Sequence, residues 1–164
     1  MSTPKPVLQV EDEEHDVIFM QLAFEQAAVS HPLAVVSDGQ EAIAYLQGEG
    51  KFSNRQAYPL PALVLLDLKL PRVPGLEVLQ WIRAQPALGS VPVLIISSSD
   101  QDADVEAAYR LGADAYIVKP AAPAELLRIV RRIKKYWLEM AGPPPGCADW
   151  LSITVPRRAG AGVT

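Results

Sequence analysis

The stretch Ala62-Leu63-Val64-Leu65-Leu66-Asp67 joins an unbroken apolar run to a carboxylate. Such runs are typical of central parallel strands that helices cover on both faces. In open α/β sheets, binding sites form where the carboxyl ends of these strands emerge. Asp67 is therefore a candidate site residue, although an Asp after a strand is as often a helix N-cap or a turn residue.

Short apolar strands alternate with helical patterns along the chain, which indicates βαβ units and a parallel sheet. The five expected strands are residues 7–10, 33–36, 62–66, 93–96 and 115–118. The first expected helix covers 14–28, the second begins at Asp38 as N-cap, the third contains Leu76, the fourth covers 102–111, and the fifth begins at Pro123. The fifth carries the clearest apolar stripe, which runs from Leu126 to Trp137.

Composition excludes several classes of function. The 164 residues, 49% of them hydrophobic, suffice for one domain of ordinary size. A net charge of −4 and a pI near 5.2 give no electrostatic footprint for nucleic acid. No apolar stretch approaches the roughly 18 residues of a membrane span. Cys147 is the only cysteine, which excludes an intramolecular disulfide and predicts a reducing, cytoplasmic location.

Polar residues follow the expected strands at one edge of the sheet. Glu11 and Asp12 follow the first strand, Asp67 the third, Ser97 the fourth and Lys119 the fifth. Three converging carboxylates repel one another unless a hard divalent cation lies between them, and Mg²⁺ is the ion that shares its shell with phosphate oxygens. Lys119 and Ser97 would contact the same phosphate oxygens, with Asp67 as the nucleophile. The arrangement predicts formation of an aspartyl phosphate.

Simpler readings exist for these residues. Glu11 and Asp12 would also fit a solvated acidic cluster that continues through Asp16. Ser97 could belong to a polar loop, and Tyr116 could be an ordinary core aromatic. The sequence leaves open whether the bond between Lys119 and Pro120 is cis or trans.

Four segments carry a family resemblance: VEDEEHD (10–16), LLDLKLPRVPG (65–75), VPVLIISSS (91–99) and GADAYIVKP (112–120). In this order and spacing they resemble the receiver domain of bacterial two-component response regulators. The resemblance covers residues 5–140. It implies a flavodoxin-like (βα)5 fold, a doubly wound parallel sheet of five strands in the order 2-1-3-4-5.

The resemblance also implies roles. Asp67 would accept a phosphoryl group from a phosphohistidine on a sensor histidine kinase, which makes the chain a phosphoacceptor switch rather than an enzyme. Glu11 and Asp12 would hold Mg²⁺ together with Asp67 and the backbone carbonyl of Lys69.

Ser97 and Lys119 would complete the site. Ser97 and Tyr116 would couple it to the face formed by the fourth helix, fifth strand and fifth helix. A receiver-fold adaptor that works without phosphorylation is the alternative function.

The connection GEGKFSNRQAYPLP, residues 48–61, is longer than the usual link between a helix and a strand, and long loops are commonly functional. It resembles the extended loop of single-domain receivers paired with phytochrome-type histidine kinases. This resemblance predicts a bacteriophytochrome as the partner kinase, with the loop as a possible contact.

Residues 141–164 form a Pro- and Gly-rich extension. Gly142-Pro143-Pro144-Pro145-Gly146 must end the last helix, and the β-prone residues 150–155 are too few to fold alone. They need a surface, either on their own domain or on a second copy. We expect the second copy, with residues 142–156 as an arm that holds a two-fold homodimer, and a disordered tail over 157–164.

Overall fold

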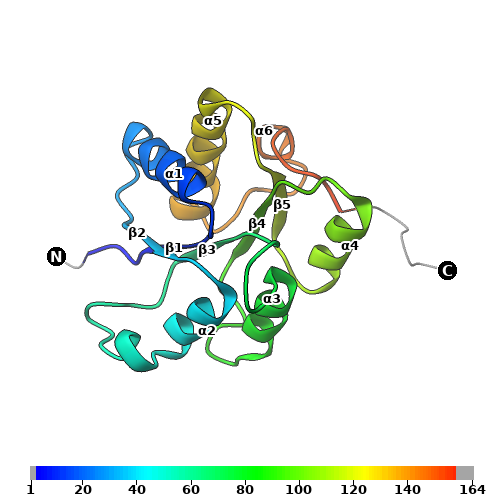
Figure 1. Cartoon of the computed structure of the whole chain (residues 1–164). Helices are drawn as coiled ribbons and strands as arrows, with labels where there is room; N and C mark the ends of the chain where they lie inside the picture. The colour runs from blue at the N-terminus through cyan, green and yellow to red at the C-terminus, as the bar shows by residue number, and fades with distance from the viewer. Residues whose placement is uncertain (1–2, 158–164) are drawn as a thin grey trace.

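The computed structural model describes residues 3–157 and contains one parallel sheet of five strands (Figure 1). Their order, β2-β1-β3-β4-β5, confirms the predicted flavodoxin-like arrangement. The strands are β1 (Val7–Val10), β2 (Leu33–Val36), β3 (Leu63–Leu66), β4 (Val93–Ser97) and β5 (Ala115–Val118). Ser97, expected just after β4, is the last residue of that strand.

Helices cover both faces of the sheet. They are α1 (Glu14–Gln26), α2 (Gly39–Gln47), α3 (Gly75–Ala84), α4 (Asp102–Arg110) and α5 (Pro123–Ile133). Helices α1 and α5 lie on one face, and α2, α3 and α4 on the other (Figure 1). Alternate residues of each central strand therefore enter two separate cores, which is why these strands read as continuous apolar runs.

Local signals set the ends of the helices. Asp38 caps α2 as predicted, because its side chain accepts a hydrogen bond from the Glu41 amide at 2.7 Å. Helix α1 ends two residues before the expected Ala28, which has a positive φ of 55° that no helix accommodates. Helix α5 continues into a π-helical turn, η2 (Lys134–Leu138), so the apolar stripe reaches Trp137 through a change of helix type.

The long connection 48–61 folds onto α2. It contains a short 3₁₀ turn, η1 (Gly50–Phe52), and the rings of Tyr45, Phe52 and Tyr58 pack with centroids 5.1 to 6.0 Å apart. Arg55 donates to the Tyr45 carbonyl at 2.7 Å and so satisfies the end of α2. The expected contact of this connection with a partner stays a prediction.

The C-terminal arm, residues 142–156, differs from the expectation in its secondary structure. Its β-prone part forms a one-turn helix, α6 (Ala148–Leu151), followed by a single antiparallel bridge between Val155 and Tyr116 of β5. In this single chain the arm packs on its own domain, and its expected placement on a second copy stays a prediction. Positive φ values at Gly142 (113°) and Gly146 (72°) turn the chain back.

Aromatic packing holds the arm there. Trp150 is buried, with its ring centroid 6.1 Å from Tyr136 and 5.9 Å from Trp137. Asp149 accepts hydrogen bonds from Tyr136 and Arg132, both at 2.8 Å. These contacts favour a helical turn over the expected strand.

Three remaining features bear on the predictions. The bond between Lys119 and Pro120 is trans. Within residues 3–157, no helix is long and apolar enough to cross a bilayer. The predicted disordered tail lies outside the described residues except for Arg157, whose guanidinium stacks 5.3 Å from the centre of the Tyr109 ring.

Candidate functional site

Sheet register brings the acidic residues together. Val10 of β1 pairs with Leu66 of β3, so the residues that follow them, Glu11 and Asp67, emerge side by side. Asp12 joins them, and ligand oxygens of these three carboxylates all lie within 4.8 Å of one another. Glu11 and Asp67 are only 4% and 5% exposed, whereas Asp12 is open to solvent.

Backbone contacts hold Asp67 in place. Its amide donates to the Val10 carbonyl at 3.2 Å, and its Oδ1 accepts from the Lys69 amide at 3.3 Å. Gly75, at the start of α3, packs directly against this segment and donates its amide to the Leu68 carbonyl at 3.0 Å. The side chain of Lys69 is exposed, and the metal-ligand role of its carbonyl stays a prediction.

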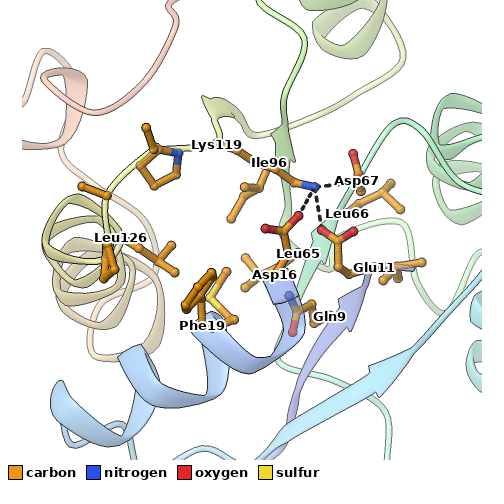
Figure 2. A pocket seen from close by; sticks show the side chains of 16 residues that line it. Gln9, Glu11, Asp16, Phe19, Leu65, Leu66, Asp67, Ile96, Lys119 and Leu126 are labelled. Carbon is orange, nitrogen blue, oxygen red and sulfur yellow. Dashed lines mark hydrogen bonds and ion pairs between the residues drawn. The ribbon is translucent and has the colours of Figure 1, made fainter. Parts of the chain in front are cut away.

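Lys119 is the cation at the centre of the site. Figure 2 shows its ammonium directed at three carboxylates: Glu11 at 2.8 Å, Asp16 at 2.9 Å and Asp67 at 3.1 Å. Burial lowers the pKa of this ammonium, but the hydrogen bonds to Asp16 and Glu11 and the charge of Asp67 outweigh burial and hold the pKa above its usual value. Lys119 therefore stays charged.

Burial is the main influence on the pKa of Glu11. Burial raises the pKa of its carboxyl to about 7, and the nearby charge of Asp67 adds to the rise, while hydrogen bonds from Lys119 and the Glu13 amide act in the opposite direction. The two hydrogen bonds do not offset the effect of burial on this pKa. The cluster of Glu11, Asp12 and Asp67 offers the hard oxygen ligands that a divalent cation prefers, so these residues fit such an ion.

Ser97 and Tyr116 lie on neighbouring strands, and both are fully buried. The Ser97 hydroxyl accepts from the Ser99 amide at 3.2 Å. The Tyr116 hydroxyl donates to the Ser99 carbonyl at 2.8 Å, so the ring already points inward in this structure. The two predicted switch residues thus contact the same short segment after β4.

A cavity of about 220 Å³ adjoins the acidic site (Figure 2). Phe19 of α1 and Leu126 of α5 form part of its apolar wall, and Asp67 and Lys119 line its polar end. Gln9 of β1 also lines it, and among the described residues its buried side-chain oxygen has no hydrogen-bond partner.

The structure therefore brings Glu11, Asp12, Asp67 and Lys119 together, with Ser97 at the end of the adjacent strand. Sequence reasoning missed Asp16, which it placed in a solvated acidic run. Asp16 lies in the first turn of α1, and its contact with Lys119 depends on tertiary packing, so no local signal in the sequence reveals it. Ser99 was also undervalued: it is buried and its hydroxyl donates to Asp104 in the first turn of α4.

A sequence profile of the response regulator receiver domain matches residues 7–131. The chain therefore belongs to the receiver-domain response regulators of two-component signalling. Response regulator Rcp1 of Synechocystis sp. (strain ATCC 27184 / PCC 6803 / Kazusa) is 36% identical over 141 residues, 86% of this chain and 94% of Rcp1.

Solved structures agree with this assignment. The phosphorylated cyanobacterial phytochrome response regulator RcpA has 37% identity and a TM-score of 0.78, over 87% of this chain and 99% of RcpA. The Mn²⁺-bound form of response regulator Rcp1 has 36% identity and a TM-score of 0.77, over 86% of this chain and 99% of Rcp1. The bacteriophytochrome response regulator RtBRR has 40% identity and a TM-score of 0.70, over 91% of this chain and 89% of RtBRR. The chain thus resembles phytochrome-associated regulators, and its acidic cluster fits a divalent metal.

Proposed function

We propose that this protein is a phosphoacceptor switch that takes a phosphoryl group from a phosphohistidine of a sensor histidine kinase onto Asp67. One observation carries the proposal: a nearly buried carboxylate lies between two further acids and a lysine, at the carboxyl edge of a parallel sheet. A buried acid with only a structural role would not need two more beside it.

The transfer forms one bond and breaks another. An Asp67 carboxylate oxygen bonds to phosphorus as the N–P bond of the phosphohistidine breaks, and the imidazole leaves as a neutral ring after taking up one proton. The product is an acyl phosphate on Asp67. Lys119, 3.1 Å from Asp67, can donate to the new phosphoryl oxygens, since its ammonium stays charged.

Glu11, Asp12 and Asp67 would hold Mg²⁺, with the Lys69 carbonyl as a further oxygen ligand. When bound, the ion neutralises charge on the phosphoryl oxygens and supports both phosphorylation and later hydrolysis. The closeness of these three carboxylates, whose ligand oxygens lie within 4.8 Å of one another, supports this assignment.

The signal would leave through Ser97 and Tyr116. Ser97 can donate a hydrogen bond from its hydroxyl to a phosphoryl group on Asp67. Because the Ser97 hydroxyl also accepts from the Ser99 amide, and Tyr116 donates to the Ser99 carbonyl, a movement of the segment after β4 would change the position of Tyr116. Tyr116 in turn belongs to the strand that the arm contacts. The output would be a change in protein contacts or a phosphorelay.

The partner we propose is a bacteriophytochrome histidine kinase, because RcpA and RtBRR are phytochrome response regulators. Helix α1 offers a surface for it. Ile18, Phe19 and Leu22 are 45%, 43% and 47% exposed on this helix, and Phe19 also lines the cavity that ends at Asp67 and Lys119. An exposed apolar strip beside the phosphoacceptor suits a helix that delivers a phosphohistidine.

We also propose a homodimer in which two copies exchange their arms. The contacts of Trp150 and Val155 within the chain are ones that a second copy could receive if the turn over residues 142–146 opened. The cytoplasmic location stays a prediction, consistent with a partner kinase that works there.

Intact mass after incubation with acetyl phosphate, with and without Mg²⁺, tests the function. We expect a Mg²⁺-dependent gain of one phosphoryl group that Asp67→Asn abolishes. Absence of any gain, from acetyl phosphate and from a phosphorylated kinase alike, would instead indicate an adaptor that works without phosphorylation.

A further inference from the structure

Asp16 contacts the cation of the site from outside the acidic cluster. It lies in the first turn of α1, and its Oδ2 is 2.9 Å from Nζ of Lys119. The ion pair joins α1 to the residue that follows β5, and both side chains line the cavity described above (Figure 2). The lysine side chain is only 17% exposed and that of Asp16 38%, so this is more than a surface contact between two mobile side chains.

The ammonium of a lysine has three hydrogens to donate. In this structure each has a carboxylate within reach: Glu11, Asp16 and Asp67. Two of these acids belong to the cluster that fits a divalent cation, and Asp16 does not. When a cation and a phosphoryl group occupy the site, Glu11 and Asp67 acquire new partners, whereas Asp16 keeps Lys119 as its partner.

We propose that Asp16 is a positioning residue: it anchors the Lys119 ammonium at the site while the other two hydrogens are released to the incoming phosphoryl group. This inference rests on the proposed function of Asp67. Asp16 does not touch the reacting atoms, and it acts through Lys119 alone. Without it, the flexible four-carbon stem of the lysine loses the one carboxylate that stays its partner when a cation engages Glu11 and Asp67.

If Asp16 only stabilised helix α1, another acid in the same turn would be equivalent to it. An acid in the first turn of a helix stabilises the helix dipole wherever it points, and Glu14 does this from the same turn. Glu14 is exposed, and among the contacts of the described residues it has none to Lys119. Glu14→Gln therefore removes the same charge from the same turn and is the matched control for Asp16→Asn.

The test compares rates of phosphorylation by acetyl phosphate at saturating Mg²⁺. We expect Asp16→Asn to lower the maximal rate about fivefold, the effect of losing one partly exposed charged contact, with little change in the donor concentration for half-maximal rate. Glu14→Gln should leave the rate unchanged, and Asp16→Glu, which keeps the carboxylate, should restore most of it. Equal rates for Asp16→Asn and Glu14→Gln would overturn the proposal.

A second measurement does not depend on phosphorylation. In ¹H–¹⁵N spectra of the full chain, the Lys119 ammonium signal is the one that Lys119→Arg removes. We expect its hydrogen exchange to be about fivefold faster in Asp16→Asn than in Glu14→Gln, because one of its three partners is gone. Unchanged exchange would overturn the anchoring role of Asp16, even if the protein is phosphorylated. Faster exchange in a protein that never gains a phosphoryl group would support the anchoring role and refute the proposed function.

Discussion

Gly75 shows how narrowly single residues define the phosphoacceptor segment. A Cβ atom at this position would lie 2.2 Å from the Asp67 carbonyl oxygen and 2.7 Å from the Leu68 Cα. Both are backbone atoms, so no side chain can move aside to make room. The start of α3 and the segment that carries Asp67 can approach this closely only because residue 75 has no side chain.

Gly75→Ala should therefore both destabilise the fold and disturb the site. We expect a loss of about 2 kcal/mol in the free energy of unfolding, typical of overpacking, measured by urea denaturation. Phosphorylation of Asp67 by acetyl phosphate should also slow, because the carbonyl of Asp67 must shift.

Gly89→Ala is the matched control for that experiment. Its Cβ would have 3.5 Å to the nearest atom, the Gln85 carbonyl oxygen, which is ordinary contact. Normal stability and phosphorylation in Gly75→Ala would show that the loop after β3 is more adaptable than this packing indicates.

The sequence predicted which residues lie at the edge of the sheet but missed a residue that contacts them from a helix. Glu11, Asp67 and Lys119 each directly follow an apolar run, so their positions at the sheet edge could be read from the strands. Asp16 lies within a helix, and its contact with Lys119 depends on how α1 sits against β5. The position of α1 relative to β5 is set by tertiary packing rather than by any local sequence pattern.

Among the elements, α1 differs most from its neighbours. Among the five helices that cover the sheet, as far as the structure describes them, α1 alone exposes large apolar side chains: Ile18, Phe19 and Leu22 are between 43% and 47% exposed. The sequence showed apolar residues here without a single stripe, because some of them face the core and others face solvent. A helix with apolar residues on two faces is ready to contact a partner.

Replacing Ile18 and Leu22 by serine should therefore affect the two phosphodonors differently. We expect transfer from a phosphorylated bacteriophytochrome kinase to fall about tenfold for each residue, as apolar area is lost from the interface. Phosphorylation by acetyl phosphate should be unchanged, since that small donor needs no docking surface.

Met140 provides the control, because it is 43% exposed and lies beyond α5 in the chain. Met140→Ser should leave both reactions unchanged. Equal losses with both donors in the α1 variants would show damage to the site rather than to a docking surface.

The sequence predicts the ends of a helix where a capping residue or a helix-breaking residue marks them. Asp38 and Gly48 mark the two ends of α2, and both were visible in the sequence. The π-helical turn after α5 and the one-turn helix α6 were not predictable in this way. Trp150 and Asp149 adopt helical backbone because Tyr136 and Arg132 bind them, and those partners are provided by tertiary structure.

At the scale of the whole molecule, the proposed dimer depends on the arm, residues 142–156. Its bridge to β5 is direct, because the Val155 amide donates to the Tyr116 carbonyl at 2.8 Å. Tyr109 reinforces the bridge: its hydroxyl donates to the Val155 carbonyl at 2.5 Å and accepts from the Tyr116 amide at 3.2 Å. The arm therefore covers the edge strand that contains the predicted switch residue. In the proposed exchange, a second copy would receive the same contacts once the turn over 142–146 opened.

Ending the chain at residue 141 should convert a dimer into a monomer, as measured by light scattering across a range of protein concentrations. Trp150→Ala should have the same effect in the full chain, because it removes a buried anchor worth about 3 kcal/mol. Leu151→Ala is the matched control, since the neighbouring Leu151 is 47% exposed and should leave the dimer intact. A dimer that survives truncation would place the interface elsewhere, and a full chain that is monomeric at every concentration would show that the arm serves its own domain by covering β5.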